Sequence, residues 1–365
     1  MGGKVGRDLS CDYTFRGSGI HVRLFPAELS CKGVYRRCTE GMSISSVIGI
    51  DIGGTNTKFG IVDASGDIVH QGQEPTSRIS SNAVLKRATE CIQRLLDIAE
   101  KNDTTVEGIG VAVTGQVDVS RGVVAGGIYG KIRGWIGTPV KEFFSEKFGL
   151  PVEVDNDGNT AILGEYVFHR RDECKNMIML TIGTGVGTGI ILDGRLFRGG
   201  NGNIGSELGH MVIDPNGPIC QCGNRGCLEA FVSGGAISER YSGLVCRSQK
   251  VPTRTDPDAI GKAYANGDKN AAVVVREVAE YIGTALGNAC NLLGPEMVVI
   301  GGGISGIGEP LISYISERIG AISFGLSRNN LKIEAARLGT YAGVFGAATL
   351  VMSDYSSITG IDNRR

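Results

Sequence analysis

The chain has 365 residues, of which 41% are hydrophobic and 21% are charged, and its formal net charge is -1. These values are typical of a globular protein of about two domains. The near-neutral charge gives no reason to expect a nucleic-acid or membrane surface, and no apolar run approaches the length that crosses a bilayer. The 57 glycines predict many tight turns and loops that approach ligands closely.

Residues 1–46 are basic and rich in glycine, and they show no sustained helical or strand period. They also lack the apolar core of a secretory signal. Met42 lies just before the first clear strand. We therefore hypothesise that Met42 is the true start of the protein, or that residues 1–41 are a disordered extension. A targeting arm is the alternative.

The first half of the ordered chain alternates strands and helices. Residues 47–63 (VIGIDIGGTNTKFGIVD) predict a strand, a turn at Gly53 and Gly54, and a returning strand. Further strands are expected at 68–71, 108–113 and 152–154. Helices are expected over 84–99, 139–148 and 160–166.

The hairpin pattern starts again at residue 177. Residues 177–193 (MIMLTIGTGVGTGIILD) repeat the order of strand, glycine turn, strand and Asp, with Gly183 in the place of Gly53. The match is incomplete, because Thr181 stands in the place of Asp51. A repeat at domain-sized spacing suggests two related halves that face each other, although two unrelated hairpins would also look alike.

The remainder of the chain is mainly helical. Two more strands are expected, over 297–301 and 332–335, and the first of them ends in three glycines. Helices are expected over 236–242, 259–265, 271–293, 310–319 and 343–352. The alternation of strands and helices along the whole chain predicts the α/β class.

Two glycine turns offer hydrogen-bond donors suited to phosphate. The candidate phosphate-binding residues are Gly53, Gly54, Thr55, Thr57 and Lys58 in the first turn, and Gly183, Thr184 and Gly185 in the second. One turn from each half could clamp a polyphosphate. The first turn lacks the G-K-[ST] ending of the common P-loop, so an ordinary hairpin turn is the alternative.

A third glycine run follows a buried strand and consists of Gly301, Gly302 and Gly303. Without side chains, it would let a flat adenine ring approach the backbone. A tight turn between strand and helix explains it equally well.

Acidic residues follow two of the predicted strands. Asp51 precedes the first turn and could hold a hydrated Mg²⁺ near the phosphates, unless it only caps the turn. Residues 155–159 (DNDGN) lie where open α/β sheets bind ligands. A carboxylate there can accept the proton of an attacking sugar hydroxyl. One or two of the five are expected merely to cap the helix that starts near Thr160.

Residues 207–229 combine a metal signature with two carboxylates. One histidine and three nearby cysteines make a full tetrahedral zinc set: His210, Cys220, Cys222 and Cys227. Four protein ligands leave no open position, so the zinc is expected to be structural. The stiffened loop would then present Glu207 and Glu229 to a polyhydroxylated substrate. Reduced core thiols are the alternative for these cysteines.

The other cysteines are placed as in a cytosolic enzyme. Cys91, Cys174, Cys246 and Cys290 are scattered singly, and three more lie in the N-terminal stretch. This placement is typical of reduced thiols and predicts a cytoplasmic protein.

The sequence resembles the ROK family of sugar kinases, repressors and uncharacterised reading frames from Met42 to the final helix. The resemblance rests on 50–55 (IDIGGT), 155–159 (DNDGN), 207–210 (ELGH) and 220–229 (CQCGNRGCLE). It implies an actin-like ATPase fold, with two ribonuclease-H-like domains around a cleft. The expected domains are 47–165 and 166–365, the second containing the zinc loop, and the final helix is expected to pack back on the first.

The resemblance also implies an activity, which is phosphorylation of a hexose by ATP with magnesium. Asp157 matches the catalytic base, and the matching sugar contacts are Asn156, Glu207, His210 and Glu229. One ring nitrogen of His210 can bind zinc while the other faces the sugar. The implied partners are a sugar and ATP, without nucleic acid or membrane, and the family expectation is a homodimer.

One position departs from the pattern of many glucose-phosphorylating members. Their Asn-x-x-Gly-Trp segment reads Lys131-Ile132-Arg133-Gly134-Trp135 here, so a lysine replaces the asparagine that helps hold the sugar. Glucose is nevertheless the first expectation, and N-acetylmannosamine is the second.

Two other classes of protein stay open. A sugar-responsive repressor would carry a winged helix-turn-helix ahead of the first hairpin, and residues 1–46 show no paired amphipathic helices. A zinc-stabilised sugar-binding protein without catalysis is disfavoured by the intact acidic cluster at 155–159.

Overall fold

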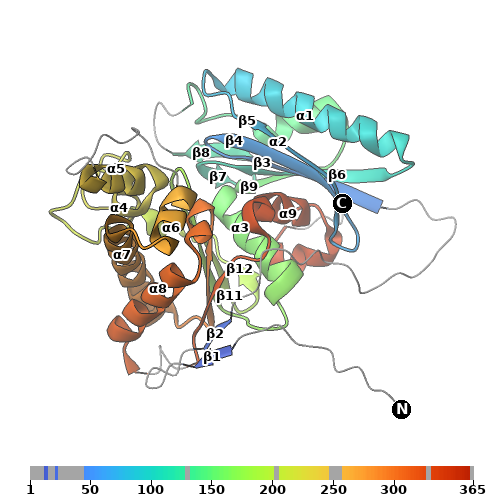
Figure 1. Ribbon diagram of the computed structural model, residues 1–365. Coiled ribbons are helices and arrows are strands. Elements are labelled where there is room, and N and C mark those ends of the chain that lie inside the picture. Colours follow the sequence, from blue (N-terminus) through green and yellow to red (C-terminus); the bar gives the residue numbers. More distant parts are fainter. Residues whose placement is uncertain are drawn as a thin grey trace, which may run out of the picture.

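The computed structural model describes residues 12–14, 21–23, 45–127, 132–200, 205–245, 257–325 and 330–361. Two sheets dominate the fold, and two helices lie between them (Figure 1). These central helices are α3 (Asp157–Glu165) and α9 (Ala342–Thr349), and the other long helices cover the outer faces of the sheets.

The first sheet has the strand order β5-β4-β3-β6-β9. Its strands are β3 (Ser45–Ile52), β4 (Asn56–Asp63), β5 (Ile68–Pro75), β6 (Thr105–Val113) and β9 (Val152–Asn156). The hairpin of β3 and β4 is antiparallel, whereas β3, β6 and β9 run parallel. Parallel strands place their carboxyl ends at one edge, and the DNDGN segment starts at that edge.

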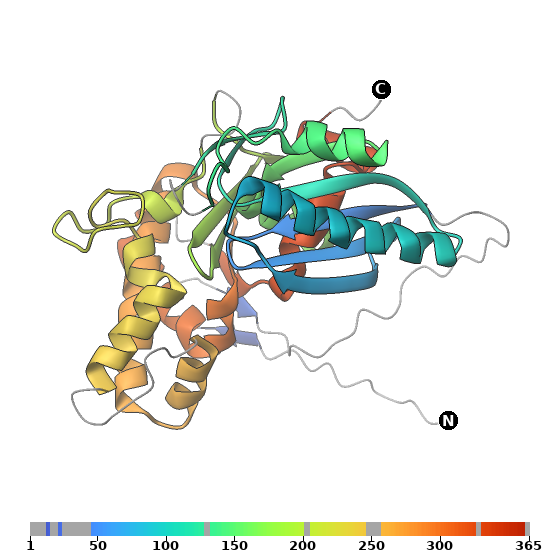
Figure 2. The ribbon, with the colours of Figure 1, turned by 90° about the horizontal axis from the view of Figure 1, so that it is seen from above.

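Two helices cover the outer face of this sheet, α1 (Ser81–Lys101) and α2 (Val140–Phe148). Figure 2 shows α1, in teal, lying along the blue strands. Its buried residues, among them Val84, Leu95 and Ala99, recur at helical spacing and pack against the sheet. A short hairpin of β7 (Gln116–Asp118) and β8 (Val123–Gly126) follows β6 and was not predicted.

The second sheet repeats the topology of the first. Its order is β1-β2-β14-β13-β10-β11-β12, so an antiparallel hairpin is again flanked by two parallel strands. The main strands are β10 (Met177–Ile182), β11 (Val186–Leu192), β12 (Arg195–Leu196), β13 (Met297–Gly301) and β14 (Lys332–Ala335). The repeated hairpin therefore belongs to a repeated five-strand unit, as the sequence pattern predicted.

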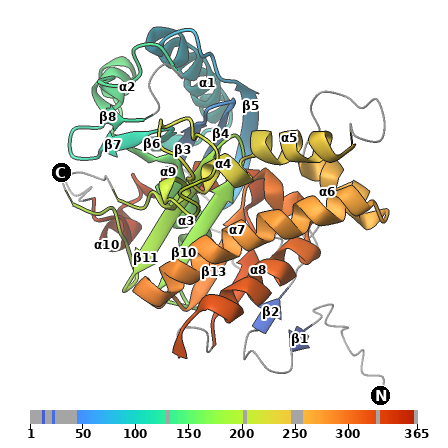
Figure 3. The same cartoon turned by 90° about the vertical axis from the view of Figure 1, so that its left-hand side faces the viewer.

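Helices cover the outer face of the second sheet as well. They are α4 (Glu229–Val232), α5 (Gly234–Val245), α6 (Pro257–Ala265), α7 (Lys269–Leu293) and α8 (Glu309–Ile322). Figure 3 shows α7 and α8 side by side across this face. A short helix, α10 (Ser356–Thr359), ends the described chain.

Two strands that were not predicted lie before residue 45. They are β1 (Asp12–Thr14) and β2 (His21–Arg23), and β2 pairs with β14 at the edge of the second sheet. The other residues of the 1–44 segment, including Met42, are not among those described. The proposed domain boundary between residues 165 and 166 falls where α3 passes into a π-helix, Tyr166–Arg170, and stays a prediction.

The two central helices touch each other and the first sheet through glycines. A methyl group on Gly346 of α9 would lie 1.6 Å from the carbonyl oxygen of Thr160 in α3. On the sheet side, a methyl group on Gly110 of β6 would lie 1.7 Å from the carbonyl oxygen of Ala347. Backbone therefore packs directly on backbone, and α9, which matches the helix predicted over 343–352, packs on the first sheet.

We predict that Gly110→Ala lowers the free energy of unfolding by more than about 2 kcal/mol, because the added methyl group must separate α9 from β6. Denaturant unfolding measures this change. The matched control is Gly243→Ala in α5, where the added methyl group would meet no described atom within 4 Å apart from its chain neighbours and its own helix backbone. Alanine is the better helix former by about 0.5–1 kcal/mol, so the control should be neutral or stabilising. Equal effects of the two substitutions would contradict this account of the packing.

Candidate active site

A pocket of about 1330 Å³ opens between the two sheets. Single small-molecule sites usually occupy about 300–1,000 Å³, so this pocket has room for two ligands together. Sixteen of the predicted site residues line it: Asp51, Gly53, Gly54, Thr55, Lys58, Asn156, Asp157, Gly183, Thr184, Gly185, Glu207, His210, Cys222, Glu229, Gly302 and Gly303.

Four predicted positions do not line the pocket. The side chain of Thr57 is 2% exposed and bonds the hydroxyl of Thr76 at 2.9 Å, so it cannot reach a phosphate there. A methyl group on Gly301 would lie 2.7 Å from the Cε of Met179, which places this glycine in the core. Cys220 and Cys227 are buried within the loop at 207–229.

The acidic loop is organised by Asn156. Its side-chain oxygen accepts hydrogen bonds from the backbone N–H groups of Gly158 and Asn159, at 2.8 and 3.2 Å. Asn156 is therefore the N-cap of α3. The helix begins at Asp157, and not near Thr160 as predicted.

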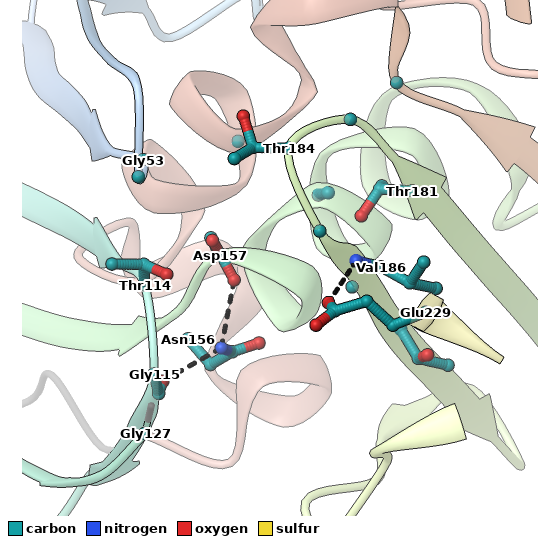
Figure 4. A pocket seen from close by; sticks show the side chains of 18 of the residues that line it. Gly53, Thr114, Gly115, Gly127, Asn156, Asp157, Thr181, Thr184, Val186 and Glu229 are labelled. Carbon is teal, nitrogen blue, oxygen red and sulfur yellow. Dashed lines mark hydrogen bonds between the residues drawn. The ribbon is translucent and has the colours of Figure 1, made fainter. Parts of the chain in front are cut away.

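The same asparagine holds the carboxylate of Asp157. Its Nδ2 donates to Oδ1 of Asp157 at 3.0 Å and to the carbonyl oxygen of Gly115 at 2.9 Å. Figure 4 shows this pair in the middle of the pocket, between Gly53 on one side and Glu229 on the other. The position suits a group that receives a proton from a ligand between the sheets.

Asp155 is a structural member of the loop. It is fully buried, and its Oδ2 pairs with Nε and Nη2 of Arg198 at 2.8 Å each. Its Oδ1 accepts hydrogen bonds from the N–H of Asn156 and from Nδ2 of Asn159. The charge of Asp155 is thus balanced inside the protein, and this carboxylate fixes the loop that presents Asp157.

Asp51 lies in a different electrostatic environment. Its pKa is raised to about 7, mainly by burial and also by the nearby charge of Asp157, while Lys58 acts in the opposite direction. Its Oδ1 is buried and has no hydrogen-bond partner among the residues that the structure describes. A carboxylate that lacks a partner and faces a second carboxylate fits a hydrated divalent cation, since oxygen ligands and water are what Mg²⁺ prefers.

Lys58 is directly opposite Asp51 in the hairpin. Its Nζ donates to the carbonyl oxygen of Thr340 at 2.7 Å, and burial lowers its pKa. Thr340 belongs to the turn just before α9. The ammonium therefore links the first glycine turn to the central helices.

The two glycine turns meet across the pocket. The hydroxyls of Thr55 and Thr184 lie 2.7 Å apart. Arg78 supports the first turn, because it donates to the carbonyl oxygen of Gly54 at 2.7 Å and to the hydroxyl of Thr55 at 2.8 Å. The two turns thus form one continuous rim of the pocket.

The four predicted metal ligands also come together. Their ligand atoms all lie within 4.8 Å of one another. The Sγ atoms of Cys222 and Cys227 are 3.7 Å apart, and Sγ of Cys220 is 3.8 Å from Nδ1 of His210. Zinc–sulfur bonds of about 2.3 Å in a tetrahedron require sulfur atoms about 3.8 Å apart, so the geometry fits zinc.

Some lining residues were not predicted as site residues. Thr114, Gly115 and Gln116 follow β6, and the indole nitrogen of Trp135 donates to the carbonyl oxygen of Thr114 at 2.9 Å. Their place just after a buried parallel strand is the signal that could have found them. Lys131, at the position that departs from the glucose-binding pattern, is not among the described residues.

A sequence model of the ROK family matches residues 47–354. The chain belongs to the ROK family. This ROK chain is 34% identical to a glucokinase of Halalkalibacterium halodurans, over 87% of the chain and 98% of that protein. It is also 32% identical to a xylose repressor of Caldicellulosiruptor bescii, over 86% of the chain and 80% of the repressor.

Comparison with solved structures leads to the same family. A ROK glucokinase from Streptomyces griseus, crystallised with glucose and AMPPNP, matches with a TM-score of 0.75 and 30% identity, covering 84% of this chain and 98% of that one. The fold is thus the actin-like ATPase fold of this family. In the described parts of the ROK chain, every helix is too short or too polar to cross a lipid bilayer.

The pKa of Asp51 leads to a prediction about stability. Since the folded protein holds this proton up to about pH 7 and the unfolded chain only to about 3.8, the wild type loses stability as the pH rises between these values. Without divalent cations, the unfolding free energy of Asp51→Asn minus that of wild type should therefore increase by about 1–4 kcal/mol when the pH is raised from 5 to 8.

Denaturant unfolding at the two pH values measures this difference, and adding Mg²⁺ should narrow it. A gap between variant and wild type that stays constant, or shrinks, as the pH rises would contradict the raised pKa.

Proposed function

We propose that this ROK protein is an ATP-dependent sugar kinase that forms glucose 6-phosphate. The observation that carries the proposal is the placement of Asp157 in the middle of the pocket, fixed by Asn156 at the start of α3. On one side lies the rim of glycine turns, and on the other lie Glu207, His210 and Glu229. The match to nearly the whole length of a glucokinase supports it.

In the proposed reaction, Asp157 accepts the proton of a sugar hydroxyl as that oxygen attacks the γ-phosphorus of ATP. The bond from the γ-phosphorus to the bridging oxygen breaks, and ADP leaves. Backbone N–H groups of the two glycine turns stabilise the charge on the phosphoryl oxygens. A Mg²⁺ ion held through Asp51 would neutralise phosphate charge when bound.

We also propose that zinc binds His210, Cys220, Cys222 and Cys227. The distances among their ligand atoms support it. Four protein ligands leave no position for substrate, so the ion would stabilise the loop and supply no chemistry of its own. The loop then holds Glu207 and His210 against the sugar.

Asp157→Asn should reduce turnover by about 10²–10⁴-fold, because asparagine cannot accept the hydroxyl proton. The fold and the binding of sugar should survive, since the amide oxygen can still accept the hydrogen bonds that Oδ1 receives. Steady-state kinetics and calorimetry with sugar measure the two effects. Substantial residual turnover would remove Asp157 from the role of base.

A coupled assay for ADP release tests the function itself. Glucose, N-acetylmannosamine, mannose, fructose and N-acetylglucosamine are offered with ATP and Mg²⁺, and the highest kcat/KM is expected for glucose. N-acetylmannosamine as the best substrate would replace glucose in the proposal. No turnover with any sugar would reject the kinase.

The second candidate is a sugar-responsive repressor, which the similarity to the xylose repressor favours. A gel-shift assay on DNA from the neighbourhood of the gene, with and without sugar, distinguishes the two. Sequence-specific binding that a sugar relieves would favour the repressor, whereas sugar phosphorylation without such binding supports the kinase.

A further inference from the structure

The two glutamates that bracket the zinc loop have different surroundings. Glu207 is exposed, and its Oε1 is 3.3 Å from Nε2 of Gln116. Glu229 is only 9% exposed, and its Oε2 accepts a hydrogen bond from the backbone N–H of Val186 at 2.8 Å. Val186 begins β11, directly after the second glycine turn. Glu229 therefore contacts the end of the second glycine turn, whereas Glu207 contacts Gln116, which follows β6.

The contact of Glu229 with the turn is close. A methyl group on Gly185 would lie 2.6 Å from Oε2 of Glu229, so the turn fits against this carboxylate only because it has no side chain there. The turn is closed by a hydrogen bond of 2.9 Å from the N–H of Gly183 to the carbonyl oxygen of Gly185. The carboxylate thus contacts the turn within the wall of the pocket that both of them line.

A second bond ties the same segment to the turn. The N–H of Gly234, just after α4, donates to the carbonyl oxygen of Gly183 at 2.8 Å. The turn is therefore held from both ends of α4, by the side chain of Glu229 at its start and by the backbone after its last residue. The position of α4 sets the position of the turn.

The cysteine–histidine cluster fixes the start of α4. Cys227 is fully buried, and its carbonyl oxygen accepts a hydrogen bond from the N–H of Ala230 at 3.0 Å. Sγ of Cys220 lies 3.9 Å from Oε1 of Glu229. The cluster thus contacts one carboxylate oxygen of Glu229, Oε1, and the turn segment contacts the other, Oε2.

We propose that Glu229 is a positioning residue for the nucleotide, through which the cysteine–histidine site holds the phosphate turn at 183–185. The inference rests on the proposed kinase function and deepens it, because it assigns Glu229 to the binding of ATP in addition to sugar. It follows that nucleotide affinity depends on Glu229, and on the metal behind it, even when no sugar is present.

The test is calorimetry with AMPPNP and Mg²⁺, without sugar, on the full chain loaded with zinc. Glu229→Asp keeps the charge but is one methylene too short to reach Val186, whereas Glu229→Gln loses the charge and keeps an oxygen that can accept the bond. The loss of one hydrogen bond to a charged group corresponds to a change of about tenfold in Kd. We expect about a tenfold rise in Kd for Glu229→Asp and less than about a threefold rise for Glu229→Gln.

The matched controls are Glu207→Asp and Glu207→Gln, which make the same changes in the other glutamate and should leave the Kd for AMPPNP unchanged. Removing the metal with a chelator, verified by elemental analysis, should raise the Kd as Glu229→Asp does. Circular dichroism confirms that every variant is folded, and both substitutions conserve most of the side chain.

The outcomes separate the inference from the function on which it rests. If Glu229→Asp binds AMPPNP like wild type, or if the Glu207 variants weaken binding equally, the positioning role is rejected and the kinase stands. If the wild type does not bind AMPPNP at all, both are rejected.

Discussion

The direct packing of backbone on backbone between α3 and α9 is the constraint on which the site depends. A methyl group on Gly346 of α9 would lie 1.6 Å from the carbonyl oxygen of Thr160 in α3, so only glycine allows this contact. Since α3 begins at Asp157, this contact sets the place of the proposed base relative to both sheets. The turn at Thr340, which receives Lys58, lies just before α9. Packing between the sheets therefore positions groups on both sides of the pocket.

Three aspartates near the pocket show how burial and pairing divide their roles. Asp155 is fully buried, but Arg198 balances its charge, so it serves as a fixed anchor. Asp157 is held by Asn156 at the first position of a helix, where backbone N–H groups favour negative charge. Among the described residues, Oδ1 of Asp51 has no hydrogen-bond partner, and its raised pKa indicates a carboxylate that is stabilised by a proton or a cation. The three side chains have the same chemistry, and their neighbours distinguish the anchor, Asp155, from the proposed base, Asp157, and the proposed metal ligand, Asp51.

Sequence patterns predicted most elements because apolar periodicity and glycine turns are local signals. The repeated hairpin led to the repeated topology, and the His-Cys spacing led to the metal cluster. Thr57 was misplaced although its neighbour Lys58 lines the pocket, and strand alternation alone could have shown that the two face opposite sides. Arg78 and Arg198 could not have been found, because single arginines carry no motif and their partners are distant in the chain or set by the packing of the sheets.

The loop at 207–229 therefore contacts more of the pocket than its sequence indicated. A closed ligand set beside two glutamates indicates a sugar-facing loop, and Glu207 fits that interpretation. Glu229 instead lies between the cysteine–histidine cluster and the second glycine turn, and the hydroxyl of Thr184 in that turn contacts the hydroxyl of Thr55 in the first. A single series of contacts thus runs from the cysteines through Glu229 and both turns to the first sheet. A shift of the loop at 207–229 would therefore move the second glycine turn, where we propose that phosphate binds, together with Glu207.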